Sequence, residues 1–296
     1  ESRRRFEILG IWFNEFRCEM NILTFDLEEW FVYQQYDKGP RDFYLPIIES
    51  YLDELLELLD RQELKATFFC LGMVGKEYPG VIKRIARKGH EIGCHSHKHQ
   101  FVYEMDYARF LKDSKEAIDI LEDITGQKVR GYRAPAFSIT EKNKWALQVL
   151  GEVGIEYDCS IFPATRSFGG FPSFTKHEPT IIKYGNTIIK EFPINIANVW
   201  GMNIAYSGGG YFRLIPYWKI QKIMKKSDYV MSYFHIRDFD AHQKKVLSLR
   251  YFKSYYGISG AFDKLKKFIC DFDFINVERA NDEFDWEKAP VIEFID

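Results

Sequence analysis

The chain has 296 residues, of which 46% are hydrophobic and 28% charged, and its 41 basic and 43 acidic side chains give a formal net charge of -2. This composition is typical of a globular protein with a large core. The near balance of charge argues against an electrostatic interface for nucleic acid or an anionic membrane surface, since such interfaces usually need a basic excess. No apolar run reaches transmembrane length, so we expect no transmembrane segment.

The first 19 residues resemble an extension in front of the folded domain. They are basic and then briefly apolar, but Asn14, Glu15 and Arg17 interrupt the apolar run too early for a secretory signal. A strand-like run begins at Met20. We therefore expect an N-terminal extension over residues 1–19, a single domain over residues 20–296, and a cytoplasmic location.

In chain order, short β-rich runs alternate with helical patterns up to Ser160. The strand candidates are NILTFD (21–26), KATFFCLG (65–72), HEIGCH (90–95), VRGYRA (129–134) and IEYDCS (155–160). Between them, apolar spacing of three to four residues predicts helices over 46–62, 81–87, 107–122 and 141–153. Regular strand and helix alternation of this kind implies a parallel sheet with helices outside it.

After Ser160 this alternation is interrupted by an irregular insertion. It contains loop-like sequence (162–179), two short strand candidates (180–185 and 187–193) and the glycine run SGGGYFRL (207–214). The alternation then resumes with a helix over 216–226, the strand DYVMSYFH (228–235) and a last helix over 261–270. So many strand and helix units favour an α/β fold in which the sheet forms a closed or nearly closed (β/α) barrel.

The active site of such a barrel lies at the carboxyl ends of its strands. Polar residues end five of the predicted strands: Asp26, His95, Arg133, Asp158 and His235. Each of these side chains alone has an ordinary structural explanation, such as a rim ion pair or a core histidine. Their occurrence together at strand ends favours a catalytic site.

Four of the seven histidines of the chain lie between His90 and His99. On a helical turn, His95 and His99 would lie on one face and could bind a single metal ion, with His97 pointing away. His90 opens a strand, so we expect it in the core or on the surface. The alternative is a solvated loop that happens to contain histidines.

The carboxylates of TFDLEEW are the other candidate metal ligands. In an extended segment, Asp26 and Glu28 lie on the same side while Leu27 faces the opposite side. One carboxylate could then bind a metal and the other act as a general base. The alternative is a solvated acidic strand end.

Arg133 ends a strand whose direction is restricted by Pro135, because proline confines the preceding Ala134 to extended conformations. A guanidinium at this place could clamp a carboxylate with two hydrogen bonds and hold a base ionised. An ordinary ion pair at the barrel rim is the alternative.

The segments TFDLEEW, HSHKH, RAPAF, YDCS and YFH, in this order, resemble the successive motifs of the polysaccharide deacetylase family, carbohydrate esterase family 4. The resemblance extends from about Asn21 to beyond His235. The stretches RGYRAPAFSIT, YDCSIFP and SGGGYFRLIPY more narrowly resemble a subfamily found with bacterial exopolysaccharide or capsule biosynthesis genes.

This resemblance implies a distorted (β/α) barrel that hydrolyses the N-acetyl group of a sugar with the help of a divalent metal, for which we expect zinc. The implied roles are metal binding for His95 and His99, general base for Asp26, orientation of that base for Arg133, tuning of the acid for Asp158, and general acid for His235. Most relatives have two adjacent aspartates in the first motif, the second of which binds the metal. Here Leu27 occupies that place, and Glu28 is the nearest substitute.

In the implied reaction, Asp26 takes a proton from water, His235 protonates the departing nitrogen, and the backbone N–H of Ala136 stabilises the oxyanion. The partner is an N-acetylated saccharide. As substrate contacts we select Trp30, Phe137, Tyr211 and Arg213. Two alternatives stay open: an allantoinase-like hydrolase of cyclic amides, and a carbohydrate-binding protein of the same fold without catalysis.

Overall fold

The computed structural model describes residues 20–28, 48–166, 168–199, 201–241 and 255–295. Its main sheet has nine strands in the order β12-β2-β3-β4-β5-β6-β8-β7-β13. They are β2 (Thr24–Leu27), β3 (Thr67–Cys70), β4 (Glu91–Cys94), β5 (Gly131–Tyr132), β6 (Tyr157–Asp158), β7 (Thr180–Tyr184), β8 (Thr187–Glu191), β12 (Phe234–His235) and β13 (Val291–Phe294). The pairs from β12 to β8 are parallel, and β7 runs antiparallel to β8.

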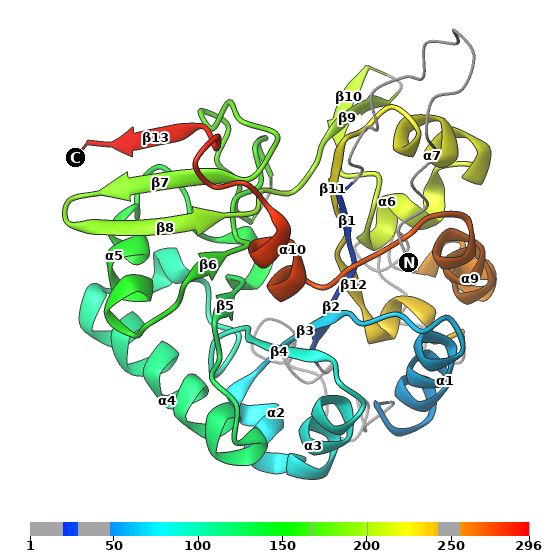
Figure 1. Cartoon of the computed structure of the whole chain (residues 1–296), viewed down its shortest axis with the longest axis horizontal. Coiled ribbons are helices and arrows are strands. Elements are labelled where there is room, and N and C mark those ends of the chain that lie inside the picture. The colour runs from blue at the N-terminus through cyan, green and yellow to red at the C-terminus, as the bar shows by residue number, and fades with distance from the viewer. Residues whose placement is uncertain (1–19, 29–47, 167, 200, 242–254, 296) are drawn as a thin grey trace, which may run out of the picture.

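Helices pack around this sheet, and all but α10 lie toward its outer side in Figure 1. They are α1 (Ile48–Arg61), α2 (Gly72–Glu77), α3 (Pro79–Arg87), α4 (Tyr107–Thr125), α5 (Trp145–Glu152), α6 (Gly209–Leu214), α7 (Tyr217–Met224), α9 (Ala261–Asp271) and α10 (Val277–Glu283). In α1 the leucines recur at helical spacing, and Leu52, Leu56 and Leu59 are fully buried in the core. The predicted α/β architecture is confirmed.

Beyond the main sheet, two further features connect the strands. One is a short additional strand pair, and the other is a side chain that hydrogen-bonds to a strand backbone. β1 (Met20–Ile22) pairs in parallel with β11 (Tyr229–Met231), which continues the β2 and β12 pair across a break in both strands. On the other side of β11, the side chain of Asn195 donates to the carbonyl oxygen of Tyr229 at 2.8 Å and accepts from the amide of Met231 at 2.5 Å. A side chain thus takes the place of backbone ladder hydrogen bonds at this point.

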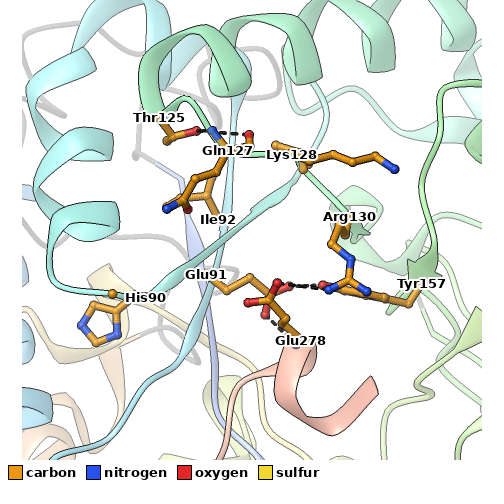
Figure 2. Close-up of a pocket in the computed structure, with 11 residues that line it drawn as sticks. His90, Glu91, Ile92, Thr125, Gln127, Lys128, Arg130, Tyr157 and Glu278 are labelled. Carbon is orange, nitrogen blue, oxygen red and sulfur yellow. Dashed lines mark hydrogen bonds and ion pairs between the residues drawn. The ribbon is translucent and has the colours of Figure 1, made fainter. Parts of the chain in front are cut away.

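The amino ends of the strands are covered by the segment that leads into α10, which lies over the centre of the ring in Figure 1. The amide of Val277 donates to Thr67 Oγ1 at 2.8 Å, and the amide of Glu278 donates to the carboxylate of Glu91 at 2.9 Å. A cavity of about 370 Å³ lies beside this contact, and Figure 2 shows Arg130 and Glu91 reaching toward Glu278 across it. The opposite, carboxyl ends of the strands remain for a site.

Several elements differ from the prediction. The run 21–26 divides into β1 and β2, and the run 228–235 divides into β11 and β12. The glycine run, for which no helix was predicted, leads into α6, and a Cβ at Gly208 directly before this helix would lie 1.9 Å from the carbonyl oxygen of Tyr233. The prediction missed α10, β13 and the hairpin of β9 (Ala197–Val199) and β10 (Met202–Ile204).

Residues 1–19, which we assigned to an extension, lie outside the described residues. In the part of the chain that the structure describes, no helix combines the length and apolarity that crossing a membrane requires.

Candidate active site

The carboxyl ends of β2, β4, β5 and β12 bring the predicted site residues to one place. His235 pairs directly with Asp26 in the parallel register of β12 and β2, and Arg133 follows the last residue of β5. His95 follows β4 in the same way. Sequence positions that are more than two hundred residues apart therefore meet, because neighbouring parallel strands end at the same edge.

Glu28, His95 and His99 form a potential metal site. Each offers one ligand atom, and these atoms all lie within 4.8 Å of one another. Oε2 of Glu28 is 2.6 Å from Nε2 of His99 and 3.4 Å from Nε2 of His95. Leu27 is fully buried in the hydrophobic core. The predicted alternation of Asp26, Leu27 and Glu28 is therefore confirmed.

The two histidines meet through a turn and not through the helical turn that we expected. Ser96 and His99 have positive φ angles of 71° and 57°, and the amide of His99 donates to Ser96 Oγ at 2.9 Å. Positive φ is unfavourable for residues other than glycine, and such strain is typical of functional sites. The imidazole rings lie 5.3 Å apart as a result.

The protonation of His95 suits a metal ligand. Its Nδ1–H donates to the carbonyl oxygen of Arg133 at 2.8 Å, so the lone pair of the neutral ring is on Nε2, the atom that faces Glu28. Metal-binding histidines usually have their second nitrogen held in this way. Two imidazole nitrogens and one carboxylate are a donor set that fits zinc.

Arg237, which the sequence analysis overlooked, pairs with the carboxylate of Glu28. Burial alone raises the pKa of Glu28, but the charges of Arg237, His99 and His235 outweigh burial and hold its pKa well below the usual range. Glu28 is therefore ionised, the state that metal binding requires. Arg237 lies two residues after His235, which ends a strand. This position was the signal in the sequence that could have indicated its pairing with Glu28.

The remaining histidines of the cluster lie away from this site. The amide of His97 donates to Asp113 at 2.8 Å, and its Nε2 is 3.3 Å from Glu116 on α4. His90 is buried, and burial lowers its pKa to about 4. The prediction that His97 points away is confirmed, and His90 lies in the core, one of the two places expected for it.

Arg133 holds Asp26 by one hydrogen bond, and not by the two that were predicted. Its Nη1 donates to Asp26 Oδ1 at 2.8 Å and to Thr24 Oγ1 at 2.7 Å. The guanidinium is completely buried and stacks 4.2 Å from the ring centre of Phe69. The second oxygen of Asp26, Oδ2, faces Nε2 of His235 at 3.8 Å. A single rigid arginine thus fixes the direction of this carboxylate.

His235 is oriented by Asp238. Its Nδ1 lies 3.0 Å from Asp238 Oδ2, which also accepts from the backbone amide of His235 at 3.0 Å. Arg213 pairs with the other oxygen of Asp238. Burial raises the pKa of Asp238, but His235 and Arg213 outweigh it, and the pKa falls below its ordinary value. Nε2 of His235 consequently faces Asp26 and Glu28.

Comparison with known protein families gives two matches, each to a different part of the chain. Residues 25–157 match the polysaccharide deacetylase family model. Over these residues the chain is similar to the polysaccharide deacetylase family. Residues 159–282 match a second model, a domain of unknown function, DUF3473. The junction falls directly after β6, so both matched regions contribute strands to one sheet.

Curated relatives match only part of the chain. A peptidoglycan-N-acetylglucosamine deacetylase of Bacillus cereus is 31% identical over 124 residues, covering 42% of this chain and 42% of the relative. A chitin deacetylase of Pestalotiopsis sp. is 33% identical over 108 residues, covering 36% of this chain and 35% of the relative. The matched segments therefore span less than half of these relatives.

A solved structure supports the fold over the full length. A crystal structure from Mycobacterium smegmatis, of a provisionally assigned polysaccharide deacetylase, superposes with a TM-score of 0.70. The superposition covers 97% of this chain and 96% of the other, at 19% sequence identity.

In this deacetylase fold, Asp158 lies apart from the role implied by the resemblance. It is fully buried, accepts from Ser160 Oγ at 2.5 Å, and is paired in register with Glu191 at the end of β8. Ser160 in turn accepts from the amide of Ala134 at 2.7 Å. These contacts support the turn after Arg133, whereas His235 is oriented by Asp238. The geometry therefore favours Asp238 for tuning the acid.

We expect Glu191→Gln to change the pH dependence of stability. Burial raises the pKa of Asp158 to about 6, and burial with the nearby Asp158 charge raises that of Glu191 well above its usual range. A carboxyl group whose pKa is higher when folded stabilises the fold at low pH, and this contribution is lost as pH rises through the folded pKa. The free energy of unfolding of the variant, relative to that of the wild type, should therefore rise by about 1 to 3 kcal/mol as the pH is raised from about pH 4 to about pH 8. Chemical denaturation at both pH values measures this gain, and a pH-independent difference would contradict it.

The residues predicted to contact the substrate differ in their exposure and in their contacts. Arg213 is buried against Asp238, so its role is to hold that carboxylate and not to contact a sugar. Phe137 is also buried, and it packs against Phe162 and Tyr233, which argues against stacking on a sugar. Tyr211 is 39% exposed on α6. Trp30 lies outside the described residues.

Ala136 lies in the turn directly after Arg133 and Pro135. Its φ is 52°, a left-handed conformation that reverses the chain beside the base and its arginine. The assignment of its N–H to the oxyanion stays a prediction.

Asp238→Asn is expected to impair only reactions that need a proton donor. Without the carboxylate, His235 loses the partner of its Nδ1 and is less able to protonate a departing amine. We expect acetate release from an N-acetylated sugar to fall by about a hundredfold. Turnover of 4-nitrophenyl acetate should change little, because its leaving group needs no proton. Equal losses on both substrates would indicate general damage to the site.

Proposed function

We propose that this chain hydrolyses the N-acetyl group of an amino sugar within a saccharide and releases acetate. The observation that carries the proposal is the meeting of a metal donor set with an arginine-held carboxylate and an aspartate-held histidine at one edge of the sheet. A carbohydrate-binding protein would need no such base and acid. The names of the relatives, deacetylases of peptidoglycan and chitin, agree with this reaction.

The residues divide the reaction between them. Glu28, His95 and His99 would hold a divalent ion, which we propose to be zinc, and this ion would polarise the acetyl carbonyl and make water a better nucleophile. Asp26 accepts the proton of the attacking water, since Arg133 binds its Oδ1 and leaves Oδ2 facing His235 in the site. His235 donates a proton to the departing nitrogen from Nε2, and Asp238 holds its ring in the required direction.

The substrate that we propose is an intermediate of bacterial exopolysaccharide or capsule synthesis. This assignment is supported by the resemblance of RGYRAPAFSIT, YDCSIFP and SGGGYFRLIPY to the subfamily associated with such genes. The reaction would leave a free amine on the saccharide, which is positively charged at neutral pH.

The test is an acetate-release assay with a panel of N-acetylated saccharides, combined with analysis of bound metal. We expect about one divalent ion per chain and metal-dependent release of acetate. His95→Ala and His99→Ala should lose both. His97→Ala is the matched control, because His97 belongs to the same loop but contacts α4. Bound metal without acetate release from any saccharide, but with hydrolysis of a cyclic amide such as allantoin, would refute the proposal.

A further inference from the structure

Three aromatic side chains form a continuous surface beside the metal ligand His99. The ring of Phe101 lies 6.4 Å from that of His99, 5.4 Å from that of Tyr103 and 6.0 Å from that of Phe168. Phe101 is largely buried, whereas Tyr103 is 43% exposed and Phe168 is 51% exposed. We call Phe101, Tyr103 and Phe168 the aromatic ridge.

Glycines fix the segment that carries Phe168. Gly169 and Gly170 have φ angles of 152° and 99°. Residues that carry a Cβ rarely adopt such angles. A Cβ at Gly169 would lie 2.3 Å from the carbonyl oxygen of Phe137, and the amide of Gly170 donates to the same oxygen at 3.0 Å. The loop thus packs directly on the turn that follows Arg133.

The segment that carries Tyr103 is attached to the same turn. Tyr103 lies in the short helix η3 (Val102–Glu104), and the amide of Val102 donates to Ser138 Oγ at 3.0 Å. Both exposed aromatic rings are therefore held by the loop that follows Arg133, the arginine that orients Asp26. The aromatic ridge has a defined position relative to the candidate base.

A contiguous patch of exposed large apolar side chains, unlike a single exposed one, often marks a ligand-binding site. Aromatic rings bury the apolar C–H faces of flat ligands effectively and lose little conformational freedom on binding. A pyranose ring has such a face, while its hydroxyl groups remain at the edge in water. A saccharide on the aromatic ridge would extend directly from the sugar that reaches His99.

We propose that the aromatic ridge is a saccharide subsite that binds the pyranose ring next to the one being deacetylated. The substrate is then an oligosaccharide or polymer and not a monosaccharide. This inference rests on the proposed function for the identity of the reacting sugar. It adds a contribution from Phe168, a residue of the region matched by the domain family of unknown function.

The test compares Tyr103→Ala, Phe168→Ala and the double variant with the wild type. Trp218→Ala is the matched control, since Trp218 is an aromatic residue on α7 with 64% exposure. The probes are N-acetylglucosamine and its β-1,4-linked pentamer, and affinities are measured by calorimetry. We expect the wild type to prefer the pentamer and the double variant to bind the pentamer about tenfold more weakly. Affinity for the monosaccharide should not change, and Trp218→Ala should behave as the wild type.

Turnover separates this inference from the proposed function. In the double variant, KM for the pentamer should rise while turnover of 4-nitrophenyl acetate stays unchanged, because the reacting groups are intact. Binding that depends on the aromatic ridge without any acetate release would refute the hydrolase and support the subsite. Equal pentamer affinity in the wild type and the double variant, or no preference of the wild type for the pentamer, would overturn the subsite.

Discussion

Asp26→Asn is expected to reduce acetate release by about a hundredfold to ten-thousandfold, because an amide cannot accept the proton of the attacking water. Bound metal should remain, since Glu28, His95 and His99 are unchanged. The substitution also leaves the buried guanidinium of Arg133 without a counter-charge, so the free energy of unfolding should fall by about 3 kcal/mol. Acetate release, metal content and denaturant unfolding measure the three effects.

Thr24→Val is the control that isolates the structural part of this loss. Thr24 Oγ1 accepts a hydrogen bond from Arg133 Nη1 at 2.7 Å, so the variant weakens the support of Arg133 while Asp26 stays in place. We expect a loss of about 1 to 3 kcal/mol in stability and continued acetate release. If Asp26→Asn keeps its turnover at a temperature where it is folded, the base is another group.

Glu28→Gln is expected to weaken binding of a divalent ion by at least about a hundredfold, since even changes outside the ligand set cost about tenfold to a hundredfold. The neutral amide is a poorer ligand, and Oε2 of Glu28 is the atom nearest to both imidazoles. Acetate release at limiting metal should fall in parallel. Titration with zinc measures the affinity.

Glu116→Gln is the matched control for this prediction. Glu116 also contacts an imidazole, that of His97, but it lies on the exposed side of α4 with a side chain that is 42% exposed. Its substitution should leave metal affinity unchanged. Unchanged affinity in Glu28→Gln, or an affinity lost only in Asp26→Asn, would mean that the two carboxylates exchange the roles assigned to them.

Local pattern predicted most of the strands and helices and several of the residues that meet at the candidate site. Amphipathic spacing placed α1 and α4, and period-two alternation placed Asp26 and Glu28 on the side opposite to Leu27. The rule that parallel barrels carry chemistry at strand ends singled out His95, Arg133 and His235. These predictions succeeded because alternation and strand ends are properties of the chain itself and do not depend on which neighbours pack against them.

Tertiary packing decided what surrounds each of these side chains. Arg213 and Asp238 are 25 residues apart, and no periodicity joins them, yet their contact orients His235. Asp158 ends its strand as predicted, but its partner Glu191 lies on the neighbouring strand β8, a pairing that the sequence did not indicate. Ser96 and His99 adopt left-handed conformations that no sequence signal indicates for residues other than glycine.

The sequence by itself therefore determined which residues are available for catalysis and at which strand ends they lie, because secondary structure follows from short-range pattern. Only the tertiary structure decided which carboxylate holds His235 and that Phe168 joins Phe101 and Tyr103 beside His99. The physical reason is that side-chain pairing depends on contacts between distant segments. Such contacts come into existence when the whole sheet closes into its ring.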